Sequence, residues 1–187
     1  MEKGTVYFFT GLAGAGKTTL GTRFYQHLKA KRPDVVLFDG DVLRDSWNTD
    51  VDYSTQARRR SARRVFHLCQ LLSEQGISIV ICSIAMYEDI RAWNRENLAN
   101  YREIYVRVTR DTLYRRDQKG LYSAGTQVVG KDLPWDEPQH PDLIVQNDGA
   151  VDPDTLVEQI EAALLKQEDL PQVIGMDKAD KKEAMNR

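Results

Sequence analysis

The sequence predicts an α/β protein in which a central parallel sheet of about five strands lies between two layers of helices. Three observations indicate this fold. Short apolar segments alternate along the chain with longer segments whose apolar residues recur at helical spacing. Residues 77–82 are apolar almost throughout, which is typical of a strand covered on both faces. A glycine-rich motif at residues 11–18 separates the first predicted strand from the first predicted helix.

The first predicted strand covers residues 5–10, which are mostly β-branched or aromatic. It leads into the sequence GLAGAGKT, which fits the phosphate-binding pattern G-x-x-x-x-G-K-[ST] at every fixed position. Leu20, Phe24 and Leu28 then recur at helical spacing. Strand, glycine-rich turn and helix, in this order, are the context that a nucleoside triphosphate site requires.

The expected role of this loop is to bind phosphate. Its glycines let the backbone curl with the N–H groups pointing inward, and the following helix adds the positive end of its dipole. Lys17 is expected to reach the β- and γ-phosphates, and Thr18 to offer its hydroxyl to Mg²⁺. We therefore expect ATP and Mg²⁺ as cofactors, bound by Gly11, Ala13, Gly14, Ala15, Gly16, Lys17, Thr18 and Thr19.

The next predicted strand covers residues 35–38 and runs into a short acidic turn. The segment that follows, residues 42–53, is polar. Ser54 is expected to be the N-cap of a long helix that runs to about residue 75 and carries an apolar stripe of Ala62, Val65, Cys69 and Leu72. Gly76 is expected to end this long helix.

The remaining elements complete the alternation. Residues 118–140 are rich in Gly, Pro and polar residues and are too long for a simple connection, so we expect a functional lid there. One domain is expected at residues 1–167, and the charged residues 168–187 are expected to form a disordered tail. Strands are predicted at residues 77–82, 103–108 and 143–145, and helices at 88–99, 111–117 and 152–166, the last with Asp152 as its N-cap.

Composition argues against several functional classes. The chain of 187 residues has a formal net charge of −2, which argues against a general nucleic-acid-binding protein. Its longest apolar run, residues 77–86, is too short to cross a bilayer, and no signal peptide is visible. Cys69 and Cys82 match no metal or redox spacing and are expected to be buried thiols. We expect a cytoplasmic enzyme that acts on a small molecule, with no nucleic acid or membrane partner.

Charged residues follow the predicted strands at the edge where ligands bind in parallel sheets. Asp39 and Asp41 follow the second strand, and Arg44 lies three residues further on. Phosphoryl transfer needs a carboxylate near the acceptor hydroxyl and cations for the spreading charge. A turn rich in Asp and Gly is also a common surface feature. Because this turn follows a phosphate-binding loop, we interpret its carboxylates as catalytic.

Arginines gather near the start of the long predicted helix and at the start of the lid. Those at positions 58, 59, 60, 63 and 64 cannot share one helix face, so at least two of them are expected on a solvated basic surface. The sharper interpretation is that Arg58 and Arg63 point towards an anionic substrate. Arg116 opens the lid, where a cation could close onto the transferring phosphoryl group.

Taken together, these segments resemble the adenylyl-sulfate kinases, which use ATP to phosphorylate the ribose 3′-hydroxyl of adenylyl sulfate. The resemblance spans about residues 4–165. Its most specific motifs are Asp39-Gly40-Asp41 with Arg44, and the string Asp-x-Lys-Gly-Leu-Tyr at residues 117–122. The other matching residues are Gly16 to Thr19, Arg58, Arg63, Arg64, Arg116, Gly130, Asp132, Glu137, Pro138, Pro141 and Asp142.

The resemblance implies a P-loop kinase fold and a role for each matching residue. Asp41 would lie nearest the acceptor hydroxyl with Asp39 beside it, and Arg116 would lie on the ATP side. Related kinases are often dimers, so the resemblance also raises a homodimer as an expectation, with a small nucleotide as acceptor. The predicted catalytic residues are Lys17, Asp39, Asp41 and Arg116, and the predicted acceptor-binding residues are Asp41, Arg44, Tyr53, Arg58, Ser61, Lys119 and Val128.

Every departure from the family pattern falls on the acceptor side. Tyr53 and Val128 stand where the family usually has two Phe residues that sandwich the acceptor adenine. Losing one ring weakens stacking, which is worth about 1–3 kcal/mol per base. Ser61 replaces an Asn, residues 85–87 read Ala-Met-Tyr in place of Ser-Pro-Tyr, and the lid is shorter. The simplest interpretation is retained chemistry with an altered acceptor.

Three alternatives to adenylyl sulfate phosphorylation stay open. A kinase that acts on cytidine diphosphoramidate, again at the ribose 3′-hydroxyl, is among the relatives linked to surface polysaccharides, some of which share an Ala-Met-Tyr-like stretch. A regulatory module without catalysis would bind ATP and release no ADP. A kinase of a sugar or small acid is disfavoured by the string at residues 117–122.

Overall fold

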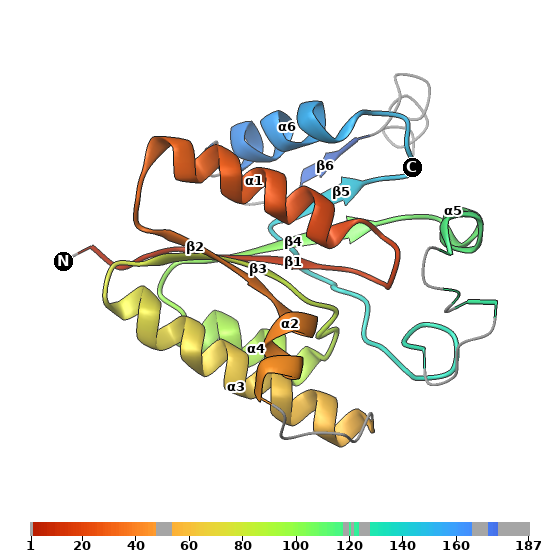
Figure 1. Cartoon of the computed structure of the whole chain (residues 1–187), viewed down its shortest axis with the longest axis horizontal. Coiled ribbons are helices and arrows are strands. Elements are labelled where there is room, and N and C mark those ends of the chain that lie inside the picture. The colour runs from red at the N-terminus through yellow and green to blue at the C-terminus, as the bar shows by residue number, and fades with distance from the viewer. Residues whose placement is uncertain are drawn as a thin grey trace.

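The structure, a computed structural model, describes residues 2–47, 54–117, 120, 122–123, 128–165 and 172–175. In these ranges strands and helices alternate along the chain (Figure 1). The strands form a parallel sheet in the order β2-β3-β1-β4-β5-β6, which confirms the predicted α/β class. The elements are β1 (Val6–Thr10), α1 (Lys17–Lys31), β2 (Val35–Asp39), α2 (Gly40–Trp47), α3 (Thr55–Glu74), β3 (Ser78–Cys82), α4 (Glu88–Asn97), β4 (Tyr101–Arg107), α5 (Arg110–Arg116), β5 (Leu143–Gln146), α6 (Pro153–Leu165) and β6 (Gln172–Ile174).

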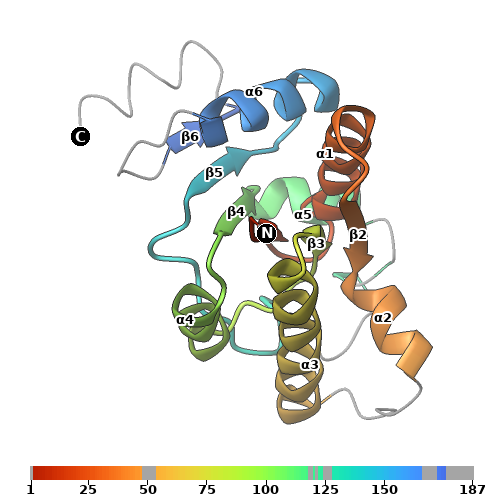
Figure 2. The same cartoon turned by 90° about the vertical axis from the view of Figure 1, so that its left-hand side faces the viewer.

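Helices cover both faces of the sheet, as the sequence predicted. Figure 2 shows α1 and α6 on one face and α3 and α4 on the other, with α2 beside the end of β2. In Figure 1, α5 lies beyond the ends of the strands rather than on a face. The carboxyl ends of the strands are the edge at which ligands usually bind in parallel α/β sheets.

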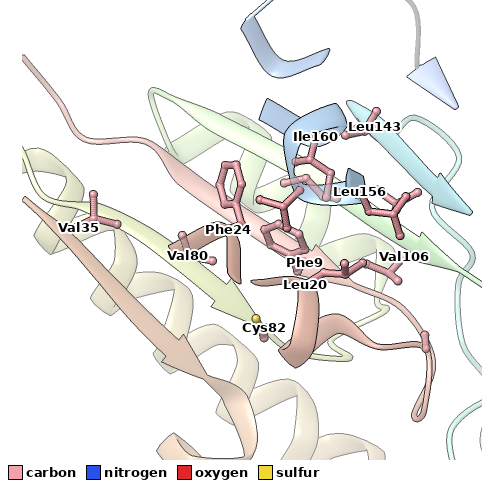
Figure 3. Packing of buried hydrophobic residues seen from close by; sticks show 14 residues of the cluster. Phe9, Leu20, Phe24, Val35, Val80, Cys82, Val106, Leu143, Leu156 and Ile160 are labelled. Carbon is pink, nitrogen blue, oxygen red and sulfur yellow. The ribbon is translucent and has the colours of Figure 1, made fainter. Parts of the chain in front are cut away.

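Two apolar clusters fill the spaces between the sheet and its helices. Figure 3 shows the cluster under α1 and α6, in which Phe9 of β1 packs with Phe24 and Ile160. On the opposite face, Phe8 and Phe66 pack edge to face with ring centroids 5.0 Å apart. Neighbouring residues of β1 pack into opposite clusters because side chains alternate between the two faces along a strand. This explains why β1 is apolar throughout.

The helix caps predicted from the sequence are confirmed. At the start of α3, Ser54 Oγ accepts a hydrogen bond from the backbone N–H of Ala57 at 3.2 Å. At the start of α6, Asp152 Oδ1 accepts one from the backbone N–H of Thr155 at 3.0 Å. Both bonds satisfy N–H groups that have no partner within their own helix.

Two segments differ from expectation. Residues 42–47, the described part of the polar segment expected after residue 41, are helical, because Asp39 Oδ1 accepts hydrogen bonds from the backbone N–H groups of Asp41 at 2.9 Å and Val42 at 3.3 Å and so caps α2. Residues 172–174 lie in the tail expected to be disordered, yet they form β6 beside β5. The sheet therefore has six strands in the described ranges rather than about five.

Both cysteines are buried, as expected from the sequence. Burial raises the pKa of the Cys69 thiol and of the Cys82 thiol to about 12. Neither thiol therefore has the thiolate character that reactivity requires. Among the helices of the described ranges, none combines the length and the apolar character needed to pass through a bilayer.

Asp148 connects the end of β5 to the start of α5. Its Oδ1 accepts hydrogen bonds from the backbone N–H of Thr109 at 2.9 Å and from the hydroxyl of Thr109 at 2.8 Å. Partial burial acts to raise the pKa of Asp148, but hydrogen bonds from Thr112, Thr109 and Gln146 outweigh it and lower the pKa to about 2. The native state therefore favours the ionised form of this carboxyl.

We expect Asp148→Ala to lower the free energy of unfolding by roughly 1 kcal/mol at about pH 7, because hydrogen bonds to a partly exposed carboxylate are lost. A carboxyl whose pKa is lowered on folding stabilises the native state above its unfolded pKa, and this contribution disappears as the pH falls from about 4 to about 2. Urea denaturation of both proteins across this interval measures the change. Glu96→Ala, at an exposed carboxylate of α4, is the control. A difference independent of pH would contradict the assignment.

Candidate active site

The predicted phosphate loop makes a tight turn between β1 and α1. Gly11 has φ 149°, and a Cβ at this residue would lie 2.3 Å from the carbonyl oxygen of Val106. Gly16 has φ 96° and is the N-cap residue of α1, with no side chain to cap the helix. The N–H groups of the first turn are thus left for an anion, which the helix dipole also favours. The predicted ATP-binding residues Gly11, Ala13, Gly14, Ala15 and Gly16 all lie in this turn.

Lys17 and Thr18 begin α1 beside the loop. Lys17 is 9% exposed, and its Nζ donates a hydrogen bond to the carbonyl oxygen of Leu12 at 2.8 Å. The ammonium group is therefore held against the loop itself. Thr18 is exposed, and its hydroxyl donates to Asp39 Oδ2 at 3.0 Å. Thr19, next to it, is exposed at the head of an open groove between α1 and α6.

Asp39 joins the phosphate loop to α2 through its two carboxylate oxygens. Oδ2 accepts the hydrogen bond from Thr18, and Oδ1 caps α2. Asp41, in the first turn of α2, is exposed and accepts a hydrogen bond from Arg44 Nη2 at 3.0 Å. The acidic turn predicted to carry chemistry is therefore anchored on one side to the loop and on the other to a helix.

A pocket lies beside Asp41, between α2, α3 and the carboxyl end of β3. It combines charged and polar groups with an apolar wall, which is typical of a small-molecule site. Four of the residues predicted to bind the acceptor line it, which are Asp41, Arg44, Arg58 and Ser61. The lining also includes Ala85 and Tyr87, from the segment that the family resemblance placed on the acceptor side, and Phe66, Ser83 and Val129, which the sequence analysis did not assign to the site.

Tyr87 forms an aromatic part of this pocket wall. Tyr87 is 6% exposed, and burial raises the pKa of its hydroxyl. The guanidinium carbon of Arg59 lies 4.7 Å from the ring centroid, and Arg59 Nη1 donates to Asp89 Oδ1 at 2.7 Å. These contacts hold the ring in place from outside the pocket. The sequence offered two signals for this residue, which are its position shortly after the buried third strand and its place in the segment 85–87, where the family pattern departs on the acceptor side.

The lid reaches the pocket one residue away from the predicted position. Val129 lines the pocket, whereas Val128, the residue named from the sequence, is buried against Leu113 and Tyr122. Val129 forms an isolated bridge with Leu133, and adjacent residues in extended backbone point to opposite sides. The expected contact of Val128 with the acceptor is therefore corrected.

Arg63 was expected to point towards the substrate, but it is not among the residues that line the pocket. Its Nη2 donates to Asp89 Oδ2 at 3.0 Å, on the side of α3 that lies towards α4. Arg58, five residues earlier, lines the pocket because it lies on a different face of the helix. Two other predicted acceptor contacts, Tyr53 and Lys119, lie outside the described residues.

Arg116 lies at the end of α5, across the phosphate loop from the pocket. The strand order explains this arrangement, because β1 has β3 on one side and β4 on the other. Arg116 Nη2 donates to the carbonyl oxygen of Asn147 at 2.7 Å, and Asn147 Nδ2 donates to the carbonyl oxygen of Ala15 at 2.8 Å. The sequence analysis missed Asn147, whose one signal is a polar side chain two residues after the strand predicted at 143–145.

The described part of the predicted lid packs onto the phosphate loop. The hydroxyl of Tyr122 donates to the carbonyl oxygen of Ala13 at 2.9 Å. Leu12 packs against the apolar cluster of Leu113, Tyr122 and Val128. Burial raises the pKa of Tyr122 to about 12, so its hydroxyl remains a hydrogen-bond donor. The lid and the loop thus form one wall of the site.

Thr18 and Asp39 suit a magnesium ion that is shared with phosphate. Their side-chain oxygens lie 3.0 Å apart, and both are hard donors of the kind that Mg²⁺ prefers. Mg²⁺ usually takes one or two protein ligands and completes its shell with water and phosphate oxygens. Within the described ranges, no group of three or more His, Cys, Asp and Glu residues could hold a metal by protein ligands alone. The donor set therefore fits an ion that arrives with a nucleotide.

Comparisons with known proteins agree with this geometry. The sequence profile of the family described as adenylylsulphate kinase matches residues 3–146. The chain is 37% identical over 147 residues to a cytidine diphosphoramidate kinase of Campylobacter jejuni, which covers 76% of this chain and 85% of that protein. It is also 37% identical over 147 residues to an adenylyl-sulfate kinase of Geotalea uraniireducens, which covers 75% of this chain and 71% of that protein.

The fold matches a solved structure of the APS kinase of Mycobacterium tuberculosis in complex with AMPPNP and APS. The TM-score is 0.80 at 29% sequence identity, and the match covers 88% of this chain and 99% of that chain. The predicted P-loop kinase fold is thereby confirmed. Sequence identity does not separate the two kinds of kinase among the relatives, because both reach the same value.

Proposed function

The chain belongs to the adenylylsulphate kinase family and is therefore a phosphotransferase, and on this premise we propose that it transfers the γ-phosphoryl group of ATP to the ribose 3′-hydroxyl of a nucleotide. The observation that carries the proposal is the hydrogen bond of 3.0 Å between Thr18 and Asp39. It joins the phosphate loop to the turn that places Asp41 in the pocket. Donor and acceptor sites would thus lie on either side of one short contact.

Each residue of the site has its own role in phosphoryl transfer. The loop N–H groups and Lys17 bind the β- and γ-phosphates. Thr18 and Asp39 would hold Mg²⁺, which when bound would neutralise part of the phosphate charge. Asp41 orients the acceptor hydroxyl and takes its proton. Arg116, on the other side of the loop, adds positive charge near the transferring group.

We propose cytidine diphosphoramidate as the acceptor, with adenylyl sulfate as the second candidate. Val129 and Ala85 line the pocket wall, and Val128, next to Val129, stands where the family usually has one of the two Phe rings that sandwich adenine. Stacking on such a ring is worth about 1–3 kcal/mol per base, and a single-ring pyrimidine loses less of it than a purine does. Adenylyl sulfate is favoured by the complex of the similar kinase, which contains APS.

We expect kcat/KM for cytidine diphosphoramidate to exceed that for adenylyl sulfate by about tenfold, the lower part of the range that lost stacking implies. A coupled ADP-release assay with both compounds and with simple nucleotides measures this ratio, and ATP without an acceptor gives the background. A clear preference for adenylyl sulfate would contradict the choice of acceptor. ATP binding without ADP release for every acceptor would instead indicate a regulatory module, and turnover of sugars or small acids alone would indicate a metabolite kinase.

A further inference from the structure

Asn147 lies where β5, α5 and the phosphate loop meet. It is the first residue after β5, and its backbone N–H donates to the carbonyl oxygen of Arg107 at 2.9 Å. This bond continues the parallel pairing of Arg107 with Gln146. The sheet therefore fixes the backbone of Asn147 at the level where β1 enters the phosphate loop.

The side chain of Asn147 supports the loop from behind. Its Nδ2 donates to the carbonyl oxygen of Ala15 at 2.8 Å, and Ala15 is fully buried. A loop that turns its N–H groups inward towards an anion turns carbonyl groups outward, and these need donors of their own. A Cβ at Gly16 would lie 2.5 Å from the same Nδ2, so the amide fits directly against the glycine.

The main chain of Asn147 makes a second contact with the site. Its carbonyl oxygen accepts the hydrogen bond from Arg116 Nη2 at 2.7 Å. Arg116 is half-buried at the end of α5, directly before the lid. One residue therefore holds both the phosphate loop and the arginine on the ATP side.

We propose that Asn147 is a positioning residue for ATP. Its amide keeps the loop in the conformation that binds phosphate, and its carbonyl keeps Arg116 beside that loop. The inference rests on the proposed function only in requiring that the loop binds ATP. It is independent of which nucleotide is the acceptor, because the acceptor pocket lies on the other side of β1.

The test compares Asn147→Ala and Asn147→Asp with Asn100→Ala. Asn100 is a matched control because its Nδ2 donates to the carbonyl oxygen of Lys3 at 3.0 Å, far from the site in the sheet. We expect the Kd for Mg²⁺·ATP, measured by calorimetry, to rise about tenfold in Asn147→Ala, since a buried carbonyl loses its donor. The rise should reach about a hundredfold in Asn147→Asp, because a carboxylate replaces the donor beside the phosphates. The control should bind ATP like the wild type.

The acceptor KM separates positioning from general damage. We expect the KM for ATP to follow the Kd while the KM for the acceptor stays unchanged. Equal increases in both KM values, or tight ATP binding by the isosteric Asn147→Asp, would overturn the inference. Wild-type protein that binds ATP but phosphorylates no nucleotide would overturn the proposed function alone, because the binding comparison among the variants would still decide the role of Asn147.

Discussion

Replacing Lys17 with alanine is expected to lower kcat by about 10²–10³-fold, the usual cost of removing one preorganised group that stabilises developing charge. Lys17 is 9% exposed, and its Nζ lies 2.8 Å from the carbonyl oxygen of Leu12, so the ammonium group is already held against the loop before a nucleotide binds. The positive charge of a buried lysine interacts with phosphate with little screening by water. The ADP-release assay with a saturating acceptor measures the loss.

A matched control lies on the same helix. Lys31 is at the far end of α1, where its ammonium group pairs with Glu161 on the surface. Lys31→Ala should therefore keep wild-type turnover. Circular dichroism should show that Lys17→Ala keeps the native helix content, since the substitution leaves the backbone of α1 intact. A folded Lys17→Ala protein with normal kcat would exclude this lysine from phosphoryl transfer.

The parts of the fold that depend on local pattern were predicted well from the sequence. Ser54 and Asp152 cap the helices expected of them, because a capping side chain acts on N–H groups only two or three residues away. α2 was missed because its cap, Asp39, was interpreted through its chemistry alone. β6 was missed because its three residues gain stability from β5, a partner that local composition does not reveal.

In the candidate site, too, the residues of a local motif were predicted from the sequence, and residues brought in by long-range contacts were not. The phosphate loop is one contiguous segment, so its motif alone predicted the turn between β1 and α1. Asn147 and Tyr87 reach the site through the order of the strands, which no single segment encodes. The sequence analysis named Val128 as a pocket residue, whereas Val129 lines the pocket. Sequence alone does not fix this choice, because a shift of one residue in extended backbone moves a side chain to the opposite face.

Replacing Asp41 with asparagine is expected to lower kcat by about 10²–10⁴-fold, the range that a positioned general base contributes. Asp41 is exposed to the pocket, and its carboxylate is oriented by Arg44 Nη2 at 3.0 Å. The amide of asparagine keeps the size and can still accept that hydrogen bond, but it takes up no proton from the acceptor hydroxyl. ATP affinity should stay near the wild-type value, because Asp39 rather than Asp41 contacts Thr18.

Asp45 provides the comparison that isolates this effect. It lies on the same helix as an exposed carboxylate, 4.0 Å from Arg44 Nε, and is not among the residues that line the pocket. Asp45→Asn changes the same charge by the same amount, so a general electrostatic effect of α2 would appear equally in both variants. If kcat falls in Asp41→Asn but not in Asp45→Asn, and the Kd for ATP is unchanged in both, the carboxylate of Asp41 acts on the acceptor. Similar small losses in both variants would place Asp41 among the surface charges, and the base would have to be sought elsewhere in the pocket.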